Sequence, residues 1–286
     1  MSRAQEIFKS GKLAVITGGA SGIGYAAAEA CLSAGMNVVV ADLAGPRLEE
    51  AAVSLGARTH SGSRMGVIAT DVADPTSIEN LKQRISREFG PVHFLMNNAG
   101  IQPGSSLFGP TENWDRVLAV NLLGIINGSR LFGPEMIAHG EPAFIVNTGS
   151  KQGITTPPGD PAYNVAKAGV KAFTEALEHE LRNTVGCQVS AHLLIPGFVY
   201  TALTKGNRTE KPDAAWTPQQ TVEFMIESLK KGDFYILCPD NDVDRRTDEL
   251  RMQWAIGDII ENRPPLSRWH PDYKEKFETY LKDHRD

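Results

Sequence analysis

The sequence TGGASGIG at residues 17–24 follows a short apolar run at residues 13–16. Its glycines at positions 18, 22 and 24 have the spacing G-x-x-x-G-x-G. Such a loop lets the backbone approach a pyrophosphate without clashes from Cβ atoms, and the N-terminus of a following helix adds a favourable dipole. An ordinary glycine-rich turn looks the same in sequence, so the loop needs support from the rest of the chain.

The segments around this loop alternate between short apolar runs and longer amphipathic stretches. The run at 13–16 has no polar alternation, which is typical of a strand buried on both faces. Helices are expected over 23–34, over 77–89 and from Asp160, an N-cap residue followed by Pro161 at the first helical position. Strands are expected at 13–16, 37–41, 65–70, 92–96, 143–146, 188–195 and 234–238.

This alternation predicts one α/β domain of the doubly wound Rossmann type, with a mostly parallel, seven-stranded sheet flanked by helices. We expect the domain to span residues 1–238 and a C-terminal extension, 239–286, to pack on it. The extension is dense in charge and adds no strand; a helix is expected over 243–260. Three roles stay open for it: a surface appendage, a lid over the active site, or a contact between subunits.

Composition excludes several classes of protein. The chain has 286 residues, 41% of them hydrophobic, and a net charge of −5 without a basic run, which argues against a nucleic-acid partner. Its three cysteines are scattered and its histidines form no metal-like pair, so neither disulfides nor a metal site are expected. No apolar stretch approaches membrane-spanning length and none resembles a signal-peptide core, which predicts a cytoplasmic protein without a membrane partner.

Asp42 ends the second expected strand, where a carboxylate can accept hydrogen bonds from both hydroxyls of an adenosine ribose. The same carboxylate would repel a 2′-phosphate, and no basic residue lies in the glycine loop or directly after Asp42. NAD is therefore predicted over NADP. Asp71 and Val72 follow the third expected strand and would face the adenine, although Asp71 also suits a plain turn.

Tyr163 and Lys167 lie four residues apart in the helix that begins after Asp160. Residues at this spacing share a helix face, so the phenol and the ammonium can point into one cleft. A free phenol has a pKa near 10, and a neighbouring cation lowers that pKa towards the range of a useful base. Such a pair also arises by chance on exposed helices, so it gains meaning only with other motifs.

In these motifs and in several others, the chain resembles the short-chain dehydrogenases/reductases over about residues 13–238. The family's motifs occur in the family's order, with one mild departure: Gly149 stands where many relatives have a second serine. The matching elements are residues 17–24, Asp71, residues 97–100 (NNAG), Asn121, Ser150 with Tyr163 and Lys167, and Pro196-Gly197 followed by Thr201.

The resemblance implies a role for each catalytic residue. Tyr163 would be the base in alcohol oxidation and the acid in ketone reduction, and Ser150 would bind the substrate oxygen. Lys167 would bind the nicotinamide ribose and lower the pKa of Tyr163, while Asn121 would hold a water of a proton relay. The cofactor would be bound by Gly18, Ser21, Gly22, Ile23, Gly24, Asp42, Asp71, Val72, Asn98, Ala99, Gly100, Tyr163, Lys167, Pro196, Gly197, Val199 and Thr201.

The substrate would be held by the loops that follow the strands, because these loops carry specificity in this fold. Gln152, Phe198, Tyr200 and Trp216 are the candidates, and Trp254 and Trp269 would join them if the extension covered the cleft. These residues favour a moderately apolar secondary alcohol or ketone as the substrate, and an aromatic substrate would also fit. Lys205 and Arg208 leave an anionic group open.

The sequence thus predicts an NAD-dependent oxidoreductase that interconverts a secondary alcohol and a ketone by hydride transfer. By analogy with the family, it would be a homodimer or homotetramer acting on a small molecule. One alternative is a catalytically silent NAD sensor or scaffold on the same fold. A methyltransferase also uses a glycine loop and an acidic residue, but it would have no use for Tyr163 and Lys167.

Overall fold

A computed structural model describes residues 2–59 and 62–285 and contains a seven-stranded sheet of order β3-β2-β1-β4-β5-β6-β7. Every pair of neighbouring strands is parallel, which confirms the predicted doubly wound α/β fold. The strands are β1 (Leu13–Thr17), β2 (Asn37–Asp42), β3 (Met65–Ala69), β4 (Phe94–Asn97), β5 (Ala143–Thr148), β6 (Val189–Ile195) and β7 (Tyr235–Leu237).

Both faces of the sheet are apolar, because each central strand contains an unbroken apolar run whose successive residues point to opposite sides. In β1, Ala14 and Ile16 pack into one hydrophobic cluster, whereas Leu13 and Val15 pack into another. All five residues of β1 are buried. The unbroken apolar runs in the sequence are therefore the signature of strands that are covered on both sides.

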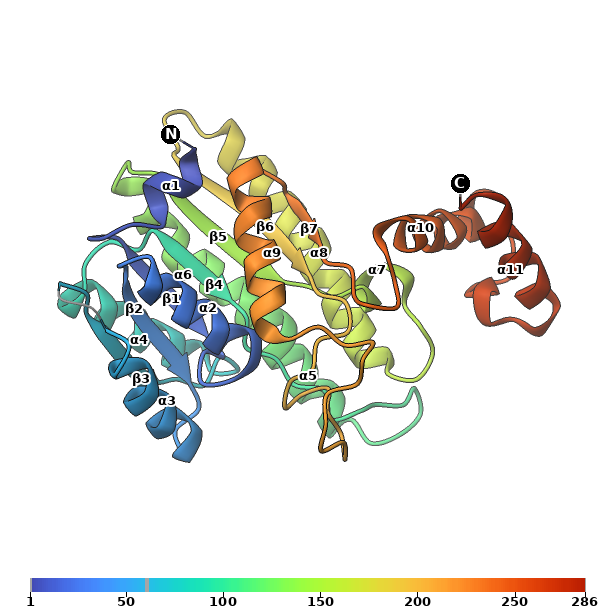
Figure 1. Ribbon diagram of the computed structural model, residues 1–286, viewed down its shortest axis with the longest axis horizontal. Coiled ribbons are helices and arrows are strands. Elements are labelled where there is room, and N and C mark those ends of the chain that lie inside the picture. Colours follow the sequence, from blue (N-terminus) through green and yellow to red (C-terminus); the bar gives the residue numbers. More distant parts are fainter. Residues whose placement is uncertain (1, 60–61, 286) are drawn as a thin grey trace.

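Helices cover the two faces in separate layers (Figure 1). One layer holds α2 (Gly22–Ser33), α3 (Pro46–Gly56) and α9 (Pro218–Lys231), with α1 (Arg3–Ile7) beside them. The other holds α4 (Pro75–Glu88), α6 (Gly124–Ala138) and α8 (Pro161–Asn183). Of the helices in these two layers, sequence prediction placed α2, α4 and α8 and left out the others. In α6 the residues Gly128, Gly133 and Pro134 disfavour a helix, so packing on the sheet decides its conformation.

A long helical segment runs through α5 (Glu112–Leu118), the π-helical turn η1 (Ala119–Leu123) and α6. By length and composition this segment could cross a membrane, but 44% of its most apolar window is buried inside the protein. Burial of that kind is typical of a helix that covers a sheet. The π-helical turn matters for the site, because π turns inserted into longer helices frequently mark functional positions.

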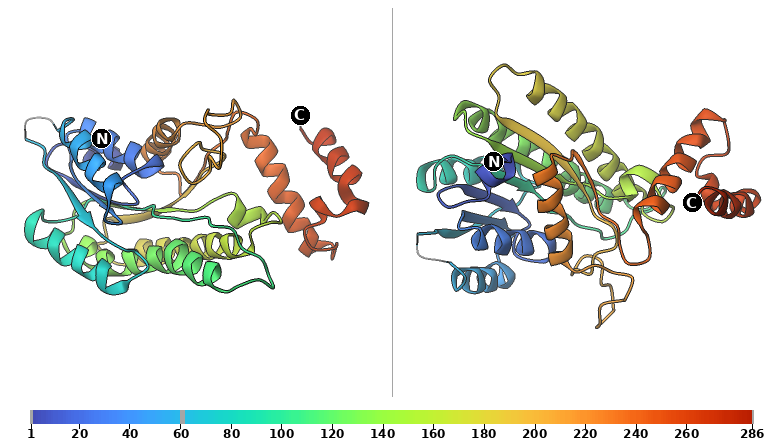
Figure 2. Two further views of the ribbon diagram at one scale, coloured as in Figure 1. Left: turned by 90° about the horizontal axis from the view of Figure 1, so that it is seen from below. Right: turned by 45° about the horizontal axis from the view of Figure 1, so that its top comes forward.

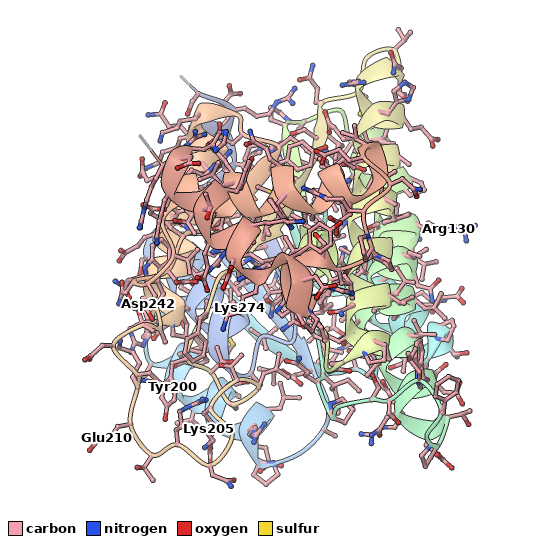
Figure 3. All side chains as sticks on the ribbon, turned by 90° about the vertical axis from the view of Figure 1, so that its right-hand side faces the viewer. Arg130, Tyr200, Lys205, Glu210, Asp242 and Lys274 are labelled. Carbon is pink, nitrogen blue, oxygen red and sulfur yellow. The ribbon has the colours of Figure 1, made fainter. Side chains whose placement is uncertain are left out.

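The C-terminal part of the chain forms an arm that projects from the body beyond the short helix α7 (Gln152–Thr155) (Figures 1 and 2). The arm has its own core, in which the indole of Trp254 packs on Phe277 and donates a hydrogen bond to Ser267 Oγ at 2.8 Å. Figure 3 places Lys274 on this arm and Tyr200, Lys205 and Glu210 on a separate loop. Its elements are α10 (Arg245–Ile260), η2 (Ser267–Trp269), η3 (Pro271–Tyr273) and α11 (Lys274–Asp283).

Candidate active site

A cavity of about 520 Å³ opens at the carboxyl ends of the strands, a size that suits a cofactor or small ligand. In a parallel α/β sheet this edge is where ligands bind. The predicted residues that line it are Gly18, Ser21, Gly22, Ile23, Asp42, Asp71, Val72, Asn98, Ala99, Gly100, Ser150, Gln152, Tyr163, Lys167, Pro196, Gly197, Phe198, Val199 and Thr201.

The glycine loop is shaped so that side chains at its glycines would clash. Gly18 has φ +64°, and a Cβ there would lie 2.7 Å from the Cα of Ala99. Gly22 has φ +56°, and a Cβ there would lie 3.2 Å from the methyl group of Thr201. Gly24 does not line the cavity; a Cβ there would lie 2.3 Å from the carbonyl oxygen of Gly18. The loop therefore offers bare backbone at the start of α2, which fits a pyrophosphate.

Asp42 lies at the end of β2, where its carboxylate accepts hydrogen bonds from the backbone amides of Ala20 at 2.9 Å and Leu43 at 2.8 Å. These bonds hold the carboxylate across the glycine loop. Arg47 lines the same cavity. The expectation that no nearby base could neutralise a 2′-phosphate is therefore wrong, because Gly45 and Pro46 turn the chain so that the first turn of α3 returns to the site.

Asp71 and Val72 line the cavity after β3, and Asp71 also has a structural role. Its Oδ1 accepts a hydrogen bond from the amide of Ala73 at 2.9 Å, which closes a local turn. The two interpretations offered for Asp71, turn residue and cavity wall, are therefore compatible.

Asn98 joins the ends of three strands at the floor of the cavity. Its amide group donates to the carbonyl oxygens of Thr17 and Gly18 at 3.3 Å each, and its Oδ1 accepts from Thr148 Oγ1 at 3.3 Å. Thr17, Asn98 and Thr148 come from β1, from directly after β4 and from β5. The network fixes the glycine loop relative to the strand end that precedes Ser150.

Tyr163 and Lys167 lie on the buried face of α8 and point into one site, as their spacing predicts. The ammonium of Lys167 lies 5.7 Å from the ring centroid of Tyr163 and donates to the carbonyl oxygen of Thr148 at 2.7 Å. Ser150, two residues beyond β5, forms a hydrogen bond with the Tyr163 side chain. Asp160 stands at the N-cap position, but its carboxylate accepts from Ser105 Oγ at 2.5 Å instead of capping α8.

Burial controls the acidity of this pair. It raises the pKa of Tyr163 to about 12, an effect that the hydrogen bond from Ser150 partly opposes and the negative charge of Asp160 reinforces. It also lowers the pKa of Lys167 to about 8. The protein groups alone therefore do not produce the expected lowering of the Tyr163 pKa. Desolvation destabilises the phenolate by more than the neighbouring protein groups stabilise it.

Asn121 is fully buried in the π-helical turn η1 and does not line the cavity. Its Oδ1 accepts from the amide of Ile101 and its Nδ2 donates to the carbonyl of Ile101, each at 2.8 Å. Both ends of the side-chain amide are therefore engaged with the backbone of Ile101. The side chain itself fixes the loop that carries Gly100 and Ile101.

The substrate end of the cavity differs from the sequence prediction. Gln152 and Phe198 line it, but Tyr200 and Trp216 do not. Trp216 packs on Phe224 with ring centroids 5.8 Å apart, and the Tyr200 hydroxyl donates to the carbonyl of Arg208 at 3.1 Å. Further lining residues that sequence reasoning did not name individually include Ile101, Gln102, Lys151, Leu203 and Thr204.

The comparison with known proteins agrees with this geometry. A model of the short chain dehydrogenase family matches residues 12–212, most of the chain. The chain is 30% identical to 1-deoxy-11-beta-hydroxypentalenate dehydrogenase of Streptomyces exfoliatus, covering 90% of this chain and 94% of that protein. It is also 30% identical to D-beta-hydroxybutyrate dehydrogenase of Cupriavidus necator, over 81% of this chain and 87% of that one.

Solved structures show the same fold. A short chain dehydrogenase/reductase from Burkholderia phymatum in complex with NAD has a TM-score of 0.79 and 31% identity, with 91% of this chain and 97% of that chain covered. L-sorbose reductase from Gluconobacter frateurii, complexed with NADPH and L-sorbose, has a TM-score of 0.69 and 26% identity, with 80% and 95% covered. Motifs, fold and relatives agree: the chain belongs to the short-chain dehydrogenase/reductase family of oxidoreductases.

Proposed function

We propose that the protein is an NAD-dependent oxidoreductase that interconverts a secondary alcohol and a ketone, with Tyr163 as the general acid and base. The observation that carries this proposal is the convergence of Tyr163, Ser150 and Lys167 in one cavity that the glycine loop also lines. A catalytically silent NAD sensor would have no need of this arrangement.

The protonation states favour distinct roles for the two oxygens. With a pKa of about 12, Tyr163 is a phenol at neutral pH and can donate a proton to a ketone oxygen. The Ser150 hydroxyl, which lies beside Tyr163, can turn its single proton to the same ketone oxygen and donate a second hydrogen bond as negative charge develops. A nicotinamide held beside Tyr163 and Lys167 would supply hydride exchange with the substrate carbon, and the positive charge of its oxidised ring would lower the pKa of Tyr163 for the reverse reaction.

Lys167 would bind the cofactor rather than the substrate. The carbonyl of Thr148 takes one of the three ammonium protons, which leaves two for a ligand in the cavity that Lys167 lines. Ribose hydroxyls are suitable acceptors for them. Gly100, Pro196, Gly197, Val199 and Thr201 would complete the nicotinamide side of the site.

The NAD preference rests on Asp42, whose carboxylate would bind the adenosine ribose and repel a 2′-phosphate. Arg47 opposes this repulsion, so the preference is expected to be moderate. Of the two solved relatives described above, one is in complex with NAD and the other with NADPH. Asp42 is nevertheless better placed than Arg47, because hydrogen bonds from the glycine loop and from Leu43 fix its position.

The substrate that this site favours is a small, moderately apolar secondary alcohol or ketone. The cavity wall contains the apolar side chains of Ile101, Phe198 and Leu203. It also contains the polar side chains of Gln102 and Gln152. Arg208 lies 5.8 Å from the ring centroid of Phe198 and bonds the carbonyl of Thr204, so its charge is engaged in the loop. The expectations of a cytoplasmic location, of a homodimer or homotetramer, and of no membrane partner remain proposals.

The test is the change in absorbance of the reduced nicotinamide ring on mixing the protein with NAD or NADH and a panel of secondary alcohols and ketones. Turnover with at least one substrate, faster with NAD(H) than with NADP(H), is expected. If NADH binds, as measured by its fluorescence, but no member of a broad panel reacts, the protein is a nucleotide sensor. If no nicotinamide cofactor binds, the assignment of the cavity is wrong.

A further inference from the structure

Lys151 lies between Ser150 and Gln152 in the cavity wall, yet its charge is engaged with two aspartates. Its Nζ lies 2.5 Å from Asp248 Oδ2 and 3.4 Å from Asp240 Oδ2. The Lys151 side chain is 19% exposed and the two carboxylates are 7% and 8% exposed. Removing one partner of such a buried group leaves an uncompensated charge, which is strongly destabilising.

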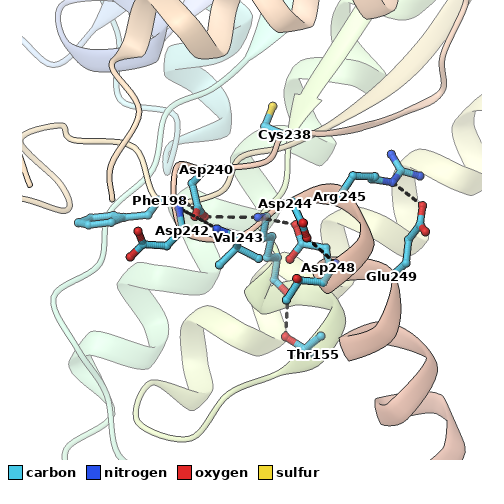
Figure 4. A network of polar contacts seen from close by, with 12 residues as sticks. Thr155, Phe198, Cys238, Asp240, Asp242, Val243, Asp244, Arg245, Asp248 and Glu249 are labelled. Carbon is cyan, nitrogen blue, oxygen red and sulfur yellow. Dashed lines mark hydrogen bonds and ion pairs between the residues drawn. The ribbon is translucent and has the colours of Figure 1, made fainter. Parts of the chain in front are cut away.

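Asp240 connects this lysine to the loop at residues 196–204, which would hold the nicotinamide and is called the nicotinamide loop below. Its Oδ2 accepts from the amide of Phe198 at 3.1 Å, and its Oδ1 accepts from the amide of Val243 at 2.9 Å (Figure 4). A Cβ on Gly197 would lie 2.7 Å from Asp240 Oδ2 and 3.0 Å from Lys151 Nζ. The glycine therefore lets the ion pair approach the backbone closely, and the pair joins the loop after β5 to the loop after β6.

Asp248 connects the same lysine to the arm. It lies in the first turn of α10, four residues after the N-cap Asp244, whose Oδ1 accepts from the amide of Thr247 at 2.8 Å. Burial raises the pKa of Asp248, and the positive charges of Lys151 and Arg251 oppose that rise. The arm core around Trp254 holds α10 in place, so the carboxylate is presented from a structured element.

The short helix α7, whose N-cap is Lys151, also packs directly on α8, the helix of Tyr163 and Lys167. A Cβ on Gly153 would lie 2.5 Å from the backbone carbonyl of Lys167. The Ser150 hydroxyl accepts from the amide of Gln152 at 3.1 Å. A shift of α7 would therefore move Ser150 relative to Tyr163 and Lys167.

We propose that Lys151 is a positioning residue, which through Asp240 and Asp248 ties the Ser150 loop and the nicotinamide loop to the C-terminal arm. On this account the arm supports the active site from the side, by an ion pair, and need not close over it as a lid. The effect on catalysis rests on the proposed function, whereas the ordering of the two loops does not.

The test compares the variants Lys151→Met, Asp248→Asn and Lys151→Arg with the control Glu249→Gln. Glu249 is the neighbour of Asp248 and pairs with Arg245 at 2.8 Å on the exposed side of α10, so its loss changes the charge of the same turn without touching Lys151. Two readouts are measured: hydrogen–deuterium exchange at residues 150–156 and 196–204 without substrate, and kcat and KM with the substrate found above.

For Lys151→Met and Asp248→Asn we expect faster exchange in both segments and a kcat at least about tenfold lower, because small misplacements of catalytic groups are costly. In Asp248→Asn, KM should change less than about twofold, since Asp248 does not line the cavity. Lys151→Arg should keep kcat within about threefold of the wild type, because it retains the charge pair, and Glu249→Gln should match the wild type in both readouts.

Exchange and kcat like the wild type in Lys151→Met would overturn the proposal. Absence of turnover in the wild type would instead overturn the proposed function, and the exchange data would still decide the role of Lys151. If the single variants do not fold, Lys151→Met combined with Asp248→Leu replaces the pair by apolar groups, which often restores stability. A wild-type kcat in that double variant would also overturn the proposal.

Discussion

Lys167 donates a hydrogen bond to the carbonyl oxygen of Thr148 at 2.7 Å, where the middle of helix α8 passes the end of β5. The ammonium is fully buried, and burial lowers its pKa to about 8. This bond aligns the residues that precede Ser150 with the helix that carries Tyr163. It also leaves protons of the ammonium for a ligand in the cavity.

Replacing Lys167 by Met should weaken NADH binding by about tenfold, because the variant loses charge-assisted hydrogen bonds to the cofactor. It should also lower kcat, since both the ribose contact and a positive charge near Tyr163 are lost. NADH fluorescence titration measures the first effect. Lys171→Met, one turn further along α8 at an exposed ion pair with Glu175, is the control and should bind NADH like the wild type.

Lys167 also makes stability depend on pH. Its pKa falls from 10.5 in the unfolded chain to about 8 in the folded one, so between these values the unfolded chain binds more protons. The free energy of unfolding therefore gains a contribution that rises with pH from about 8 to about 10.5, by up to ~3 kcal/mol.

Urea unfolding at pH 7.5 and pH 10 measures this contribution as the difference between the wild type and Lys167→Met. The stability of the wild type relative to the variant should be higher at pH 10. A difference that is the same at both pH values would show that the folded protein does not depress the pKa of Lys167.

Asp42 and Arg47 should act in opposite directions on cofactor choice. Asp42→Ala removes a ribose acceptor and a repulsive charge, so the ratio of kcat/KM for NAD over NADP should fall by about tenfold or more. In that background, Arg47→Met should restore part of the ratio, because the cation that could neutralise a 2′-phosphate is gone. An unchanged ratio in Asp42→Ala would mean that this carboxylate does not contact the ribose.

Asn121 should act through Ile101. Asn121→Ala leaves the partly buried amide and carbonyl of Ile101 without their partner, which should cost about 1–3 kcal/mol of unfolding free energy. Urea unfolding measures this cost, with Asn127→Ala, a partly exposed position on α6, as the control. Equal stability of the two variants would contradict the structural role of the Asn121 side chain.

The sheet was predictable because each central strand is covered on both faces, which leaves unbroken apolar runs such as residues 13–16. The approach of Tyr163 to Lys167 was predictable because helical spacing fixes it locally. Helix α6 was not, because its glycines and Pro134 disfavour a helix that tertiary packing nevertheless stabilises.

The parts of the site that depend on how loops fold back to the cavity also could not be predicted from the sequence. Arg47 reaches the cavity through the turn at Gly45 and Pro46, and Lys151 meets Asp248 across almost a hundred residues of chain. Trp216 looked like a ligand contact by its aromatic character, but it packs on Phe224. Residue type alone does not distinguish an aromatic that lines a cavity from one that fills a core.

The most direct test of the central claim is the rate of NADH oxidation by a ketone substrate in Tyr163→Phe. The variant keeps the ring and its packing but has no proton to donate, so kcat should fall by about 10²–10⁴-fold while the Kd of NADH stays within about twofold. A Tyr163→Phe enzyme that turns over within tenfold of the wild type would contradict the assignment of Tyr163 as the acid and base.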